Sequence, residues 1–341
     1  GAGTGTTSYY YSFLGHPNPT NTDIEYGETT WQTNPPDPRD SFEQENSYHN
    51  SMLFMKRIKS DDVRMIIPRF NWQSGSIYDR YRHNIDHINP STSVDGKTLY
   101  ESKYIVVNSE FKVYICINNG EDPENENGRK STYEPNFATI TPQKATTNAS
   151  DGYIWKYLFT IPPEDVIKFA TEKYIPLPKD WGVGSNADVF NASADGKLEK
   201  NAITIKNRGS EYQFSSGSQV TLPIYGDGVG GKVSITINDN KVESAEIVDG
   251  GSGYTKAFVI FQGAGESDIG TAYATALNHV DANDTSTPRV TISTGSGAEF
   301  EIACPPKGGH GFDINRECGA NKVMVHSKYD SDPDYVIGND F

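Results

Sequence analysis

The sequence predicts a mainly β protein with some α-helix, an α+β fold in which a mixed N-terminal domain carries an inserted β-sandwich-like repeat module. Three observations predict this fold. Short runs of alternating apolar and polar residues, rich in aromatic and β-branched side chains, recur along the chain. Apolar residues at helical spacing are confined to a few short segments. The middle of the chain is rich in Gly, Ser, Thr and Val and contains an internal repeat.

The N-terminal part begins with an aromatic strand at Tyr9–Gly15, followed by a loop rich in Pro, Asn and Thr that continues to Pro38. Asp40 or Ser41 then resembles a helix N-cap, and Gln44 completes a capping box with Ser41. The pattern predicts a helix from there to Lys59, on apolar residues at helical spacing: Tyr48, Met52, Met55 and Ile58.

Alternating patterns predict the strands that come next. Val63, Met65 and Ile67 alternate before Pro68, which would end the strand. Tyr104–Val107 and Phe111–Ile117, joined by a polar turn, predict a β-hairpin. Tyr153–Phe159 is another aromatic strand; Pro162 and Pro163 end it, and Pro163 is placed to start a short helix. Lys322–His326 predicts the last strand.

Internal similarity marks the middle region. Ile205–Tyr212 resembles Ile247–Tyr254 at an offset of 42 residues, and both blocks contain a Gly-Ser pair followed by Tyr. Short strands at 219–222 and 258–261 follow the blocks, and 290–298 resembles a third half-copy. We interpret the region as repeated β units whose turns use Gly for positive φ.

Length and composition limit the remaining possibilities. The chain has 341 residues, a formal net charge of −15 and 11% aromatic residues. This length suggests two to three domains at ~150 residues each. We expect an N-terminal α+β domain (1–195), a Gly-rich β-repeat domain (196–303), and a C-terminal segment (304–341) that packs back on the first. The chain begins at Gly1 and not at methionine, so we expect a fragment or a processed form, truncated after Phe341.

Charge and cysteine usage exclude several classes. No window approaches the ~20 apolar residues of a membrane span. The negative charge disfavours a surface that tracks nucleic-acid phosphates. Three cysteines, Cys116, Cys304 and Cys318, are odd in number and far apart. They predict buried free thiols in a reducing cytosol and indicate neither a disulfide framework nor a zinc site.

One motif resembles a nucleotide fingerprint. Residues 226–231 spell G-x-G-x-x-G, and 226–232 also spell the first seven residues of a P-loop. Both motifs require a helix next, because its N-terminal amides must face the phosphate. An alternating strand, 233–237, follows instead, and Val233 cannot supply the magnesium ligand. We therefore interpret the motif as a β-turn of the repeat module.

Other candidate sites are equally weak. His83 and His87 are four residues apart with Asp86 between them, but Asn84 stands where H-E-x-x-H has its glutamate. Gly251-Ser252-Gly253 falls short of a G-x-S-x-G nucleophile elbow and repeats a turn motif. We attribute the pairs Glu121-Asp122 and Asp61-Asp62 to solvated loops. The aromatic strands at 9–13 and 153–159 suit core or interface packing better than base or sugar stacking. We therefore expect no catalytic, cofactor-binding or metal-binding residues and no enzymatic activity.

Several segments carry a family resemblance. Residues 151–163 are similar to the D-G-Y-V-W-x-Y-L-F-x-I-P-P signature of the baseplate wedge subunit of contractile-tailed phages of the T-even type. Residues 65–72 resemble its I-P-R-x-x-W segment, and 112–116 resemble its V-Y-x-C strand. Residues 10–15, Met52 and the Pro-Lys-Gly-Gly-His-Gly run at 306–311 resemble versions in phages of marine bacteria, in which Gly-Ser-Gly-Tyr repeats form an inserted β region.

The resemblance covers most of residues 9–180 and 304–341. It implies a structural, non-enzymatic virion protein of the tail baseplate, assembled in the host bacterial cytoplasm. Such a protein forms a homodimer, contacts other wedge proteins, and transmits conformational change during sheath contraction. Nucleic acid, membrane, small-molecule substrate and cofactor are not implied as partners. Relatives continue past the Gly-Asn-Asp-Phe segment that ends this chain.

Two other function classes stay open at this point. A carbohydrate-binding or adhesin-like virion β protein would explain the Tyr and Gly content, although residues 201–303 contain no Trp for a binding platform. A virion hydrolase or lyase would need a cleft of clustered His and carboxylates, for which His83, Asp86 and His87 are the nearest candidate.

Overall fold

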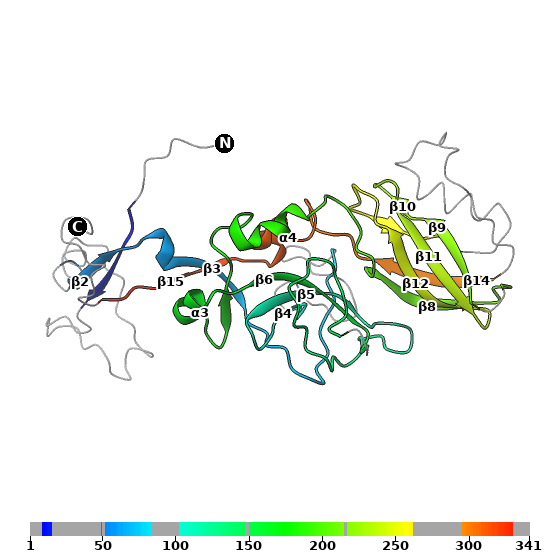
Figure 1. Cartoon of the computed structure of the whole chain (residues 1–341), viewed down its shortest axis with the longest axis horizontal. Helices are drawn as coiled ribbons and strands as arrows, with labels where there is room; N and C mark the ends of the chain where they lie inside the picture. The colour runs from blue at the N-terminus through cyan, green and yellow to red at the C-terminus, as the bar shows by residue number, and fades with distance from the viewer. Residues whose placement is uncertain are drawn as a thin grey trace, which may run out of the picture. The chain divides into compact units, whose positions relative to one another are not determined.

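The computed structural model describes residues 9–15, 49, 52–83, 102–146, 150–214, 217–261 and 295–329. Within these ranges the protein is mainly β, as predicted, with several small sheets and a few short helices (Figure 1). The chain forms two compact units. The first unit contains residues 1–64 and 323–341, and the second contains residues 65–322. The expected division at 195 and 303 stays a prediction.

The first unit is built on a two-stranded antiparallel sheet of β1 (Tyr11–Gly15) and β2 (Met52–Arg57), with Phe13 opposite Met55. The predicted strand near the N-terminus is confirmed. The predicted helix to Lys59 is wrong over Met52–Arg57, because pairing with β1 outweighs the weak preference expressed by helical spacing. Its expected start, from Asp40 to Tyr48, lies outside the described residues. A 3₁₀ turn, η1 (Ser60–Asp62), follows β2.

The second unit contains a mixed core around two sheets. β4 (Ile105–Val107), β5 (Lys112–Asn119) and β6 (Tyr153–Thr160) form one antiparallel sheet, which confirms the predicted hairpin and aromatic strand. β3 (Val63–Pro68) pairs with β7 (Tyr174–Pro176) in a sheet of order β15-β3-β7. The boundary between the two units falls within β3 and within β15 (Lys322–Val325).

Helices in the second unit are short. α3 (Pro163–Phe169) begins with proline at its first turn, where a missing N–H costs nothing, as the sequence predicts. η2 (Gly184–Asn186) leads into α4 (Ala187–Asn191), and α6 (Ile314–Glu317) is capped by the Asp313 side chain.

β5 is central to the mixed core because both of its faces are buried. Val113, Ile115 and Ile117 contribute to one apolar cluster, whereas Tyr114 and Cys116 contribute to another. This alternation follows from the two-residue period of a strand. Trp155 of β6 lies on the Tyr114 side and stacks on Tyr153 with ring centroids 5.3 Å apart. The aromatic strand 153–159 is therefore core, as interpreted from the sequence.

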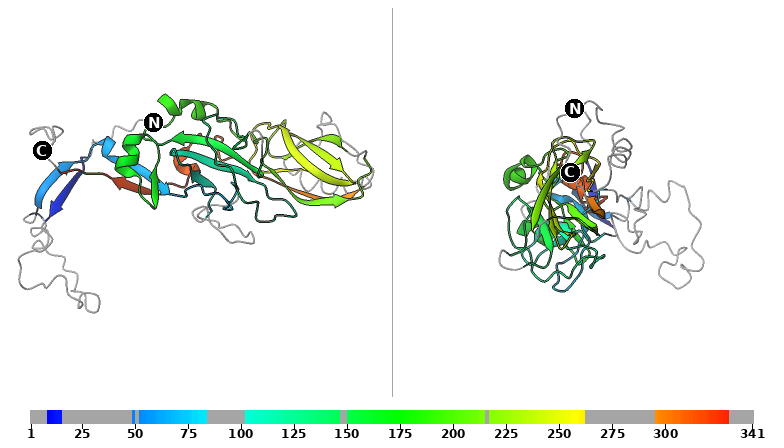
Figure 2. Two further views of the ribbon diagram at one scale, coloured as in Figure 1. Left: turned by 60° about the horizontal axis from the view of Figure 1, so that its bottom comes forward. Right: turned by 90° about the vertical axis from the view of Figure 1, so that its right-hand side faces the viewer.

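A β module with its own apolar core follows in the same unit; Figure 2 shows its strands from two further sides. β8 (Ile203–Ser210) pairs with β14 (Ser296–Ile302). β9 (Ser218–Pro223), β11 (Lys232–Asn238) and β12 (Lys241–Asp249) form a three-stranded antiparallel sheet in the order β12-β11-β9. A short pair, β10 (Tyr225–Gly226) with β13 (Ala257–Phe258), completes the described strands.

Candidate interaction surfaces and polar sites

The G-x-G-x-x-G motif serves packing in this structure. Gly226 ends β10, and strand β11 begins directly after Gly231, so a strand stands where phosphate binding would need a helix. The Tyr254 hydroxyl accepts a hydrogen bond from the Gly231 amide and donates one to the Ile224 carbonyl, each at 3.0 Å. A Cβ at Gly228 would overlap the Tyr254 ring. The glycines therefore leave room for a buried tyrosine, and the motif forms a bend between β10 and β11.

The other repeat block has the same local geometry. The Tyr212 hydroxyl accepts from the Ala298 amide and donates to the Phe261 carbonyl, each at 3.1 Å. A Cβ at Gly295 would overlap the Tyr212 ring. Residues 295–298 thus correspond to residues 228–231. Residues 290–294 of the expected third half-copy lie outside the described ranges.

The same correspondence extends to the glycine three residues before each tyrosine. Gly209 and Gly251 have φ of 62° and 55°, and their amides donate to the side chains of Asn207 and Asp249. Ser252 pairs with Val229 by an isolated antiparallel bridge, so the Gly-Ser-Gly sequence is a bridged segment of the module and not the strand-to-helix turn of a nucleophile elbow. Both tyrosines are buried, which removes them as platforms for a sugar ring.

The His83 side chain accepts a hydrogen bond from the backbone. Its Nδ1 atom accepts a hydrogen bond from the Cys304 amide at 3.2 Å, and burial lowers the pKa of the imidazole. Asp86 and His87 lie outside the described residues. Among the residues that the structure describes, no group of three or more His, Cys, Asp or Glu side chains is placed to hold a metal ion.

Glu121 corrects the expectation that the carboxylate pairs lie in solvated loops. Its side chain is 3% exposed and pairs with Arg80, whose Nε atom lies 2.9 Å away. The neighbouring Asp122 caps its own loop, accepts from the Glu124 amide and pairs with Arg129. Asp62 accepts from the Lys59 amide in an exposed turn, as expected.

Glu121 belongs to a ring of four alternating charges, which we call the charge ring: Arg80, Glu121, Lys206 and Glu301. Arg80 contacts both carboxylates, with Nη2 2.7 Å from Glu301, and Lys206 also contacts both. Burial alone would raise the pKa of Glu301, but Arg80 and Lys206 outweigh it and lower that pKa to about 2. Sequence reasoning missed this cluster, because its members are far apart in the chain.

One exposed aromatic face lies on the first unit. Tyr9 lies two residues before β1, and Tyr11 and Phe13 alternate along this strand. The three side chains are 57%, 39% and 47% exposed, respectively. The Arg57 guanidinium lies 4.1 Å from the centre of the Tyr9 ring, a cation–π contact. An isolated two-stranded sheet is marginally stable, so this aromatic face is suited to burial against a partner.

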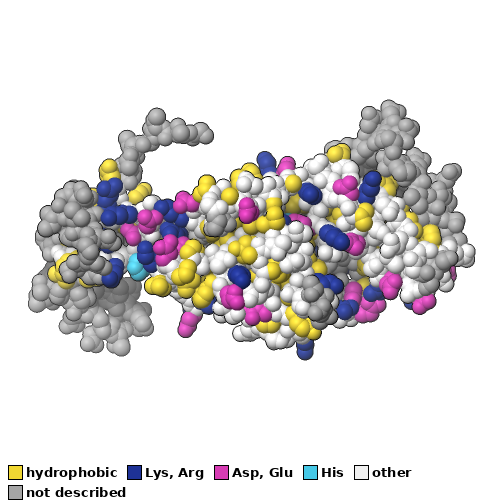
Figure 3. All heavy atoms as spheres, in the orientation of Figure 1, with side chains coloured by type: hydrophobic (Ala, Val, Ile, Leu, Met, Phe, Trp, Pro, Cys, Tyr) yellow, Lys and Arg dark blue, Asp and Glu magenta, His cyan; other side chains and the backbone are white. Residues whose placement is uncertain are grey.

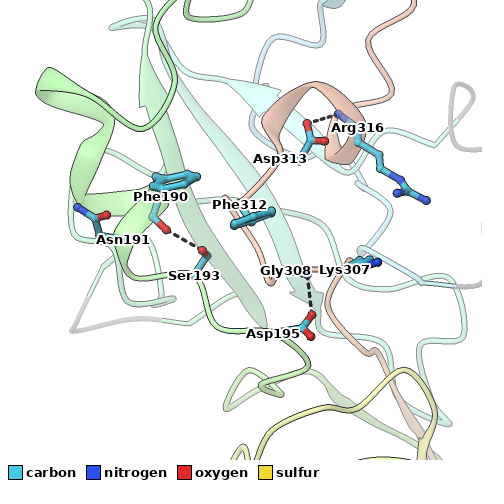
Figure 4. Close-up of a pocket in the computed structure, with 9 residues that line it drawn as sticks. All are labelled: Phe190, Asn191, Ser193, Asp195, Lys307, Gly308, Phe312, Asp313 and Arg316. Atoms are coloured by element: carbon cyan, nitrogen blue, oxygen red, sulfur yellow. Dashed lines mark hydrogen bonds between the residues drawn. The ribbon is translucent and has the colours of Figure 1, made fainter. Parts of the chain in front are cut away.

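A cavity of about 730 Å³ lies between the end of α4 and the segment 307–316 (Figure 4). Phe190 and Phe312 stack in it with ring centroids 5.5 Å apart. Its carboxylates support the backbone: Asp195 accepts from the Gly308 amide and Asp313 from the Arg316 amide. No side chain in this cavity is placed as a nucleophile beside a base, so we assign it no chemistry.

The visible surface mixes charged and apolar side chains without one dominant sign of charge (Figure 3). No helix in the described ranges is both long enough and apolar enough to cross a bilayer.

Two comparisons find similarity to one phage protein. A family model described as Bacteriophage T4, Gp8 matches residues 130–204, which include β6 and α3. The chain is 26% identical over 193 residues to the baseplate wedge protein gp8 of Enterobacteria phage T4. That alignment covers 50% of this chain and 57% of the T4 protein. The chain thus spans less than two thirds of the curated relative that it matches, and no solved structure gives a significant match.

Proposed function

We propose that this protein is a structural component of the baseplate wedge in the tail of a contractile-tailed phage. The observation that carries the proposal is the similarity to the T4 baseplate wedge protein, together with the family match at 130–204. The matched range contains the segment 151–163, in which Tyr153, Trp155 and Phe159 are fully buried. The similarity therefore falls on residues that shape a core, as expected for two chains with a shared fold in this part.

In this proposal this chain forms a homodimer and contacts other wedge proteins. Its described surface offers a face of the kind that interfaces use: Tyr9, Tyr11 and Phe13 side by side, with Arg57 at one edge. Aromatic side chains and Arg are enriched at protein interfaces and carry much of their binding free energy.

The function is mechanical and not enzymatic. The protein is assembled in the host cytoplasm and resides in the tail baseplate, where it transmits conformational change during sheath contraction. It is organised as a wedge domain (1–195), an inserted β-repeat domain (196–303) and a C-terminal segment (304–341). The apolar cores of the mixed region and of the β module support this mechanical role, because closely packed interiors transmit strain.

Two measurements on the purified protein and the virion test the proposal. Light scattering is expected to give a dimer, and imaging of assembled tails with a tagged chain is expected to place sixfold-arranged copies in the baseplate, two per wedge. Phe13→Ser is expected to weaken the dimer, whereas Tyr133→Ser, at a similarly exposed aromatic residue of the second unit, is the matched control. A strictly monomeric protein that binds no other baseplate subunit would contradict the proposal.

A further inference from the structure

Two strands connect the mixed core to the β module. Ala202 and Ala303 contribute to the mixed core, whereas Ile203 and Ile302, their chain neighbours, contribute to the module core. The chain therefore passes from one core to the other at the start of β8 and again at the end of β14. Residues 195–200 add backbone hydrogen bonds to the module, such as the one from the Leu198 amide to the Gly250 carbonyl at 3.0 Å. Side-chain contacts across the connection then set the angle between the cores.

The charge ring lies across this connection. Arg80 and Glu121 belong to the mixed core side, at the segment after Tyr78 and at the loop after β5. Lys206 and Glu301 project from β8 and β14 of the module. Each carboxylate contacts one cation from its own side and one from the other side.

Burial makes the geometry of the ring specific. The side chains of Arg80 and Glu121 are 2% and 3% exposed, whereas those of Lys206 and Glu301 are 37% and 32% exposed. The two mixed-core members therefore lie in a site with little access to water when a partner from the module moves away. A buried charge that loses a partner is strongly unfavourable. Arg82, on the mixed core side, adds a further contact to Glu121 at 3.2 Å.

A second ionic contact runs parallel to the ring. Arg208 projects two residues after Lys206 and forms two parallel bonds to Glu124, at 3.0 and 2.9 Å. Its Nη1 atom also donates to the Val242 and Glu243 carbonyls of β12, which ties the contact to the module. Fork-to-fork pairs of this kind fix orientation as well as distance.

We propose that the charge ring, assisted by Arg208 and Glu124, locks the angle between the mixed core and the β module, so that the two cores move as one rigid body. A displacement applied to either core is then passed to the other without an intervening hinge. The lock is a property of the isolated chain and goes beyond the proposed place of the protein in a baseplate.

A distance measurement between the cores tests the lock. Ile167→Cys on α3 and Lys241→Cys at the start of β12 give two exposed labelling positions, while the three native cysteines are buried. Double electron–electron resonance of spin labels at these positions is expected to give one narrow distance distribution. Adding Lys206→Met with Arg208→Met is expected to broaden that distribution, with unchanged near-ultraviolet circular dichroism from the aromatic cores.

The control removes an ion pair within one core. Lys112→Met breaks the Lys112–Glu110 pair of the mixed core and is expected to leave the distribution as narrow as in the parent. If the double variant unfolds, the distance distribution of the single variant Lys206→Met tests the proposal instead. In that variant Arg80 still contacts Glu121 and Glu301, and Arg82 still contacts Glu121. A distribution that stays narrow in folded Lys206→Met protein, and in the double variant where it folds, overturns the proposal. So does equal broadening by Lys112→Met.

Discussion

Tyr212 and Tyr254, 42 residues apart, make the same pair of hydrogen bonds: each buried hydroxyl accepts from one backbone amide and donates to one backbone carbonyl. Both rings lie against glycines whose side chains, if present, would overlap them. The sequence repeat is therefore a repeated packing unit, in which a tyrosine enters a glycine turn. Because the bonds match, the contributions of Tyr212 and Tyr254 to the free energy of unfolding can be compared directly.

Replacing either tyrosine by phenylalanine should lower the free energy of unfolding by a similar amount. Tyr254→Phe leaves the Gly231 amide and the Ile224 carbonyl without their partner in a buried site, at a cost of about 1–3 kcal/mol. Tyr212→Phe should cost about as much. Urea unfolding measures both, with exposed Tyr133→Phe as the control, expected within about 0.5 kcal/mol of the parent. A large loss for only one of the two buried tyrosines would contradict the equivalence.

Gly228→Ala should destabilise the module more than Gly217→Ala. A Cβ at Gly228 meets the Tyr254 ring, whereas a Cβ at Gly217 meets open space and costs only backbone strain of about 1 kcal/mol. Thermal unfolding of both variants measures the difference. Added ATP or NAD should shift the melting temperature of the parent protein by nothing measurable, since no helix follows the motif. A higher melting temperature with either nucleotide would contradict this prediction and would indicate that the G-x-G-x-x-G motif binds nucleotide.

Acid should weaken the protein as the charge ring loses its carboxylates. The pKa of Glu301 is about 2 in the folded state against 4.5 for a free side chain, and that of Glu121 is also lowered. A depressed folded-state pKa contributes stability that is present above about pH 4.5 and is lost as the pH falls toward 2. For Glu301 this amounts to roughly 1–3 kcal/mol after allowance for solvent screening. Urea unfolding between pH 7 and about pH 2 measures it, and Glu301→Gln should flatten the dependence.

Glu317→Leu should cost about 3 kcal/mol of stability, because it removes one partner of a buried pair. The Glu317 carboxylate contacts His310 Nδ1 at 2.5 Å and accepts from the Gly311 amide at 2.7 Å. These bonds hold the Gly-His-Gly part of the 306–311 run against α6. Calorimetry compares this variant with Arg316→Ala, an exposed neighbour for which little change is expected. Equal melting temperatures for the two variants would show that the pair contributes nothing.

The three thiols should be unreactive until the protein unfolds. Cys116, Cys304 and Cys318 are buried and unpaired, and burial raises the pKa of Cys304 to about 12. A disulfide reagent at about pH 8 is expected to modify none of them in the native state. In urea it should modify all three. Fast reaction of one thiol in the folded protein would mark a locally open region at that position.

Alternation and turn chemistry predicted most strands of the mixed core but missed the short strand β7, whose three residues show too little alternation. Val113, Ile115 and Ile117 are apolar on one face of β5 and Tyr114 and Cys116 on the other, which is the pattern of a strand buried on both sides. The prediction of a helix over Met52 and Met55 was wrong, because the local spacing of apolar residues carries no information about β1, with which that segment pairs.

The charge ring could not be predicted from the sequence. Glu121 and Glu301 are separated by 180 positions, and each looks like an ordinary surface carboxylate beside other polar residues. Only the pairing of β8 with β14 brings Lys206 and Glu301 to the same end of the module. Burial then changes what these charges do, and burial is a tertiary property.

Ile203 and Ile302 face each other across the β8–β14 ladder, and the Ala303 amide donates to the Ala202 carbonyl at 2.9 Å. The chain thus leaves the mixed core at Ile203 and returns to it at Ile302, at opposite positions of one strand pair. A two-residue turn is long enough to join Ala202 directly to Ala303. An insert exchanged at this strand pair would leave the order of the mixed-core strands unchanged, and it would have to cover Leu198 and Cys304, which pack in the core of the present module.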